Sequence, residues 1–100
     1  MQPEYIQTMQ NLYGELIHIL PELEKNLTLW QRANAINEQL EAFYFDENWL
    51  ALHQHQEGIE LDTQGHYSVL SEDALWNAFA EQRSIALKQL KIVADALQEK

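Results

Sequence analysis

The stretch Val69-Leu70-Ser71-Glu72-Asp73-Ala74-Leu75-Trp76 combines three kinds of helix-start signal. Ser71 has a hydroxyl that can accept a hydrogen bond from a free backbone N–H of the first helical turn, as an N-cap does. Glu72 and Asp73 would place negative charge at the positive end of the helix dipole. Leu70 and Leu75 are placed as the two members of a hydrophobic staple. We therefore predict a helix over residues 71–98, with Leu70, Ser71 and Leu75 as its structural determinants.

The N-terminal part of the chain has the apolar spacing of a long helix that begins near Pro3. Large apolar side chains recur at steps of three and four residues, which places them on one helix face: Ile6, Met9, Tyr13, Leu16, Leu20, Leu23, Leu27 and Trp30. An interior proline costs about 3 kcal/mol, because it removes a hydrogen bond and clashes with the preceding turn. Two alternatives follow for Pro21. Either one helix continues with a kink there, as the unbroken apolar phase favours, or the helix breaks and a second helix begins.

Residues 45–70 lack a sustained helical pattern and are expected to form a loop that returns the chain across the helices. Asp46 can cap a short helical turn, and Gly58 and residues 62–65 are turn signals. A loop of this length in a small domain needs side chains that hold it in place. We predict that Trp49 is buried against the helices and holds the loop, and we expect little or no β-structure.

The composition is that of a folded helical domain. The 100 residues are 46% hydrophobic and include only three glycines and two prolines, which is typical of a single globular domain over residues 1–100. The expected fold class is all-α, an antiparallel helical hairpin or bundle. The lack of cysteine fits a reducing, cytoplasmic location. Residues 1–24 have four glutamates and no lysine or arginine, unlike a signal peptide, and no apolar run is long enough to span a membrane.

The net charge is −10 and is unevenly distributed. Between Arg32 and Arg83 the chain has ten acidic residues and no basic one. We do not expect direct nucleic-acid binding, because phosphate contacts require a basic patch. The acidity favours solubility and self-repulsion. The alternatives are a basic protein partner or an acidic inhibitor that mimics nucleic acid.

Three histidines, His53, His55 and His66, are the candidate metal ligands, with several acidic residues near them in sequence. Imidazole and carboxylate groups bind zinc, nickel or iron. In a helix, however, His53 and His55 would point about 200° apart, so we expect solvated histidines and no metal. No phosphate-binding loop, nucleophile elbow or zinc-protease motif occurs. We expect no cofactor and favour a non-enzymatic role; a metal-dependent enzyme that uses residues 53–66 is the enzymatic alternative.

The order of these features resembles the bacterial DUF4298 family, whose function is unknown. The resemblance rests on the long N-terminal helix, the Phe43-Tyr44 pair, Trp49, the acidic loop and the stretch 69–74. Family members tend to have glycine where this chain has Ser68, and an acidic residue shortly after the tryptophan, where this chain has Leu52 and His53. The resemblance implies an architecture and no biochemical activity.

The apolar surface of the predicted N-terminal helix is too wide for one facing helix to bury. It includes Tyr5, Ile6, Met9, Leu12, Tyr13, Leu16, Ile17, Ile19 and Leu20. We therefore expect a small cytoplasmic interaction protein that forms a homodimer, or that binds a hetero-partner through the same strip. Because the like charges of two copies repel, the homodimer should tighten as salt screens them.

Overall fold

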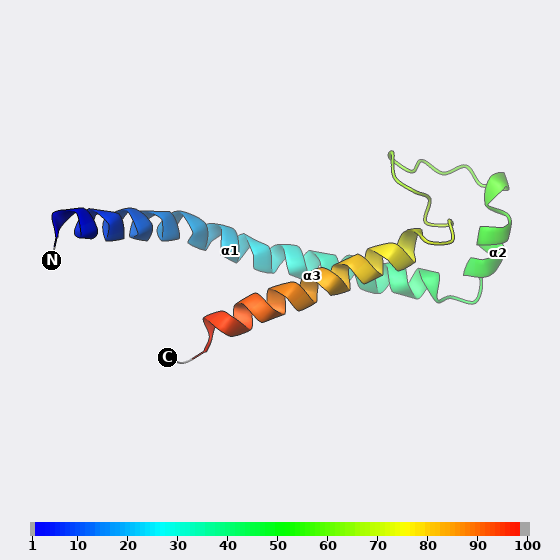
Figure 1. The fold of residues 1–100 in the computed structure, drawn as a ribbon. Coiled ribbons are helices and arrows are strands. Elements are labelled where there is room, and N and C mark those ends of the chain that lie inside the picture. Colours follow the sequence, from blue (N-terminus) through cyan, green and yellow to red (C-terminus); the bar gives the residue numbers. More distant parts are fainter. Residues whose placement is uncertain (1, 99–100) are drawn as a thin grey trace. The chain divides into compact units, whose positions relative to one another are not determined.

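The computed structural model describes residues 2–98, and over that range it contains three α-helices (Figure 1). These are α1 (Pro3–Tyr44), α2 (Trp49–Gln54) and α3 (Ala74–Ala96), and a short 3₁₀ helix, η1 (Gln56–Gly58), follows α2. No strand occurs in residues 2–98. The predicted all-α class is confirmed. None of the described helices has a stretch long and apolar enough to cross a membrane.

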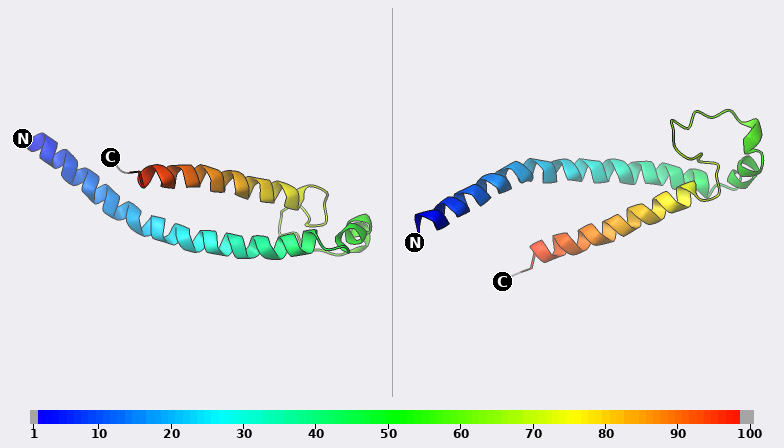
Figure 2. Two further views of the ribbon diagram at one scale, coloured as in Figure 1. Left: turned by 90° about the horizontal axis from the view of Figure 1, so that it is seen from below. Right: turned by 45° about the horizontal axis from the view of Figure 1, so that its top comes forward.

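The chain divides into two compact units, Met1–Glu38 and Gln39–Lys100. What the structure describes of the first unit is helical from Pro3 onward and consists of the greater part of α1. The second unit holds the last turns of α1, all of α2 and η1, the loop that follows, and α3. Figure 2 shows the loop after α2 returning the chain to the start of α3.

The long helix α1 is continuous through Pro21. Of the two alternatives, a single helix is therefore confirmed and a break at Pro21 is wrong. Pro21 has no N–H to donate to the carbonyl of Ile17, but the cost of one missing bond is local. Good helix-forming residues and an unbroken apolar phase on both sides keep the helix intact.

The C-terminal helix is confirmed, but its bounds are 74–96 in place of the predicted 71–98. The residue before α3 is Asp73, and its side chain makes no capping hydrogen bond. The prediction that Ser71 is the N-cap is wrong, because its hydroxyl donates to the carbonyl of Ser68 at 2.7 Å. The Ser71 N–H donates to the same carbonyl at 3.0 Å. Residues 68–71 thus form a β-turn, and the helix cannot begin until the turn has ended.

The segment predicted as a loop, residues 45–70, contains α2 and η1. Asp46 stabilises the turn that leads into α2, because its carboxylate accepts from the Asn48 N–H at 2.8 Å. Farther on, Gln64 and Gly65 both have positive φ, 56° and 86°, and His66 N–H donates to the Thr63 carbonyl at 3.0 Å. This combination is typical of a tight type I′ turn and confirms the turn signal at residues 62–65.

Few side chains are removed from water. Of the residues that the structure describes, Leu70 and Leu75 are the two buried hydrophobic ones, each 5% exposed. They lie on either side of residues Ser71 to Ala74, in the second unit. Burial of two leucines is small for a chain of this length, since each buried side chain of that size stabilises by about 2 kcal/mol.

Candidate functional site

An aromatic cluster in the second unit is centred on Tyr44, near the end of α1. Its ring meets that of Trp49 at the start of α2 edge to face, with centroids 4.8 Å apart. It also lies edge to face with Phe45 at 5.1 Å and with Phe79 of α3 at 6.0 Å. Such edge-to-face pairs each stabilise by about 1 kcal/mol beyond the burial of their surface. Tyr44 therefore joins the end of α1, the start of α2 and the first turns of α3.

Two side chains of α2 hold the β-turn at residues 68–71. The indole Nε1 of Trp49 donates to the carbonyl of Val69 at 3.2 Å, and Nδ1 of His53 hydrogen-bonds the carbonyl of Leu70. Trp49 and His53 are four residues apart, so they lie on one face of α2. Their rings are stacked, with centroids 5.1 Å apart and planes 5° apart. We call Trp49, His53 and the carbonyls of Val69 and Leu70 the loop clasp.

The loop clasp determines the tautomer of His53. A backbone carbonyl can only accept a hydrogen bond, so Nδ1 carries the hydrogen. The amide group of Gln56, whose Nε2 lies 3.3 Å from Nδ1, therefore cannot be donating to that nitrogen at the same time.

The β-turn inside the loop clasp is closed by its own serines. The Leu70 N–H donates to the Ser68 hydroxyl oxygen at 3.1 Å, while the Ser68 carbonyl accepts both bonds from Ser71. A hydroxyl at position 68 thus supplies an acceptor that glycine would lack. Leu70 is the third residue of this turn, and its side chain is buried. The hydrogen bonds of the loop clasp and of the β-turn all join groups of this chain, so the loop clasp has a structural role.

The structure does not assemble the three candidate metal ligands. His53 belongs to the loop clasp, whereas His55 follows α2 and is exposed, and His66 is exposed at the end of the tight turn. In residues 2–98 no group of three or more His, Asp or Glu side chains is placed to hold a metal ion.

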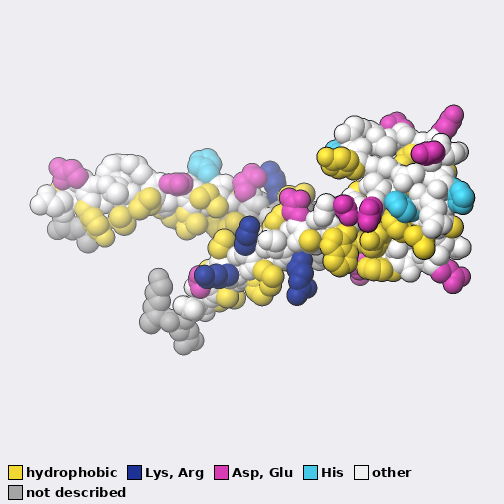
Figure 3. All heavy atoms as spheres, turned by 45° about the vertical axis from the view of Figure 1, so that its right-hand side comes forward, with side chains coloured by type: hydrophobic (Ala, Val, Ile, Leu, Met, Phe, Trp, Pro, Cys, Tyr) yellow, Lys and Arg dark blue, Asp and Glu magenta, His cyan; other side chains and the backbone are white. Residues whose placement is uncertain are grey.

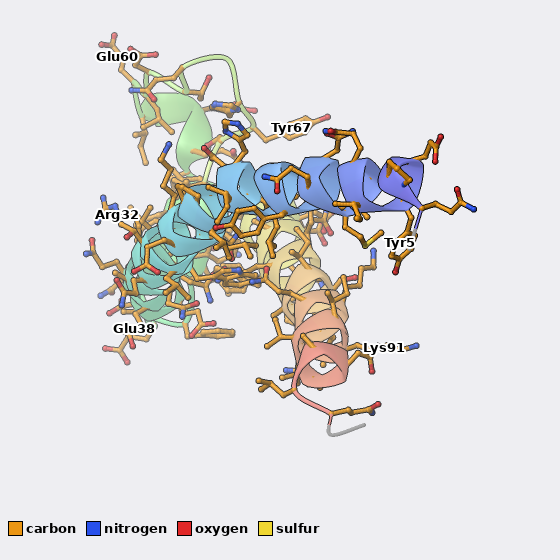
Figure 4. All side chains as sticks on the ribbon, turned by 90° about the vertical axis from the view of Figure 1, so that its left-hand side faces the viewer. Tyr5, Arg32, Glu38, Glu60, Tyr67 and Lys91 are labelled. Carbon is orange, nitrogen blue, oxygen red and sulfur yellow. The ribbon has the colours of Figure 1, made fainter. Side chains whose placement is uncertain are left out.

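A row of exposed apolar side chains follows the N-terminal part of α1 in the first unit (Figure 3). We call it the α1 seam, and its members are 40–57% exposed: Tyr5, Met9, Leu12, Leu16, Leu20, Leu23 and Leu27. Figure 4 shows Tyr5 projecting outward from the first turns of the helix. Further large apolar side chains on either side of the row, Ile6, Tyr13, Ile17 and Ile19, are also exposed. The apolar surface that the sequence predicted for this helix is thus open.

The role of His53 was missed by reasoning from sequence, which treated it as a solvated loop histidine. The available signal was its position four residues after Trp49, which puts both rings on one face if the segment is helical. Trp76 is next to the buried Leu75 but is 58% exposed itself, so it is no core residue.

The sequence model of DUF4298, described as a domain of unknown function, matches residues 6–92. No curated protein and no solved structure has a significant match to the chain.

Proposed function

This chain belongs to the DUF4298 family, and we propose that it is a small cytoplasmic interaction module that associates with a second copy of itself through the α1 seam. The exposure of all seven seam residues carries the proposal. Contiguous apolar surface of this kind on a protein in water marks an interaction site. The commonest assembly of a soluble homo-oligomer is a two-fold dimer.

The low stability of an isolated helix in water also supports the proposal that α1 packs against a partner. A helix held together by helical propensity alone is only marginally stable in water. Most of the stability of helices in proteins comes from the packing of an apolar face. The side-chain hydrogen bonds within the first turns of α1, such as Gln7 to Asn11 at 2.9 Å, lie on the exposed surface and contribute little. A second copy packed on the α1 seam would supply the missing burial and would complete a helical bundle.

Light scattering behind a sizing column tests the proposal. We expect the parent chain at tens of micromolar to have twice the mass of one chain. Leu16→Gln, within the α1 seam, should shift the mass toward one chain. Leu29→Gln is the matched control, because Leu29 is on the same helix, is 67% exposed and lies off the α1 seam. A monomeric parent, or equal effects of the two substitutions, would overturn the proposal and point to a hetero-partner on this face.

A further inference from the structure

We draw no further inference here: the strongest candidate, the strip of exposed apolar and basic side chains that Arg83, Leu87, Leu90 and Lys91 form along α3, carries none, because an acidic peptide and an anionic lipid surface would fit it equally and nothing in residues 2–98 shows what covers it.

Discussion

The indole nitrogen of Trp49 donates a hydrogen bond to the carbonyl of Val69, 20 residues later in the chain. One turn farther along α2, His53 bonds the carbonyl of the next residue, Leu70. Because consecutive carbonyls of one β-turn are held by two stacked rings, the turn has little freedom to rearrange. The loop clasp thereby sets both the burial of Leu70 and the residue at which α3 can begin.

Trp49→Ala should destabilise the folded chain by about 3 kcal/mol, the lower end of the range for large aromatic truncations, because Trp49 is half-buried. The variant loses the hydrogen bond to Val69 and the ring contacts with Tyr44 and His53. Trp76→Ala is the matched control, since Trp76 is 58% exposed, and should cost about 0.5 kcal/mol. Urea denaturation at one fixed protein concentration measures both, and equal costs would contradict the role of the loop clasp.

His53→Ala should cost about 1–2 kcal/mol, the cost of leaving the Leu70 carbonyl without its donor. His55→Ala, at an exposed position two residues away, should leave the free energy of unfolding unchanged within about 0.5 kcal/mol. Nitrogen NMR of the imidazole provides a second measurement and should find the hydrogen on Nδ1 of His53. The opposite tautomer, with the hydrogen on Nε2, would rule out the bond to Leu70.

Substitutions of Ser71 distinguish a turn hydroxyl from a helix cap. An N-cap accepts a hydrogen bond, so aspartate would replace serine well. In the β-turn the Ser71 hydroxyl donates to the Ser68 carbonyl, and a carboxylate cannot donate. Ser71→Asp should therefore be no more stable than Ser71→Ala, with each about 1 kcal/mol below the parent. Parent-like stability of Ser71→Asp in chemical denaturation would restore the capping role.

The error in the predicted helix start has a specific physical cause. Ser71, Glu72 and Asp73 satisfy the local preferences of a first helical turn, and those preferences are visible in the sequence. The hydrogen bonds from Trp49 and His53 come from another part of the chain, and they fix residues 69 and 70 in a turn. Sequence reasoning could place the helices, the loop between them and the turn at residues 62–65, because those depend on local signals. It could not find the loop clasp, because that depends on contacts across 17 and 20 residues.

Salt should tighten the dimer. Each chain has a net charge of −10, so two copies repel, and ions screen that repulsion with a Debye length of about 30 Å at 0.01 M and about 10 Å at 0.1 M. The apolar contacts of the α1 seam change little over that range. Sedimentation equilibrium at the two salt concentrations should give a several-fold lower Kd at the higher one. Weaker association at the higher salt would mean that opposite charges hold the copies together, contrary to an apolar seam.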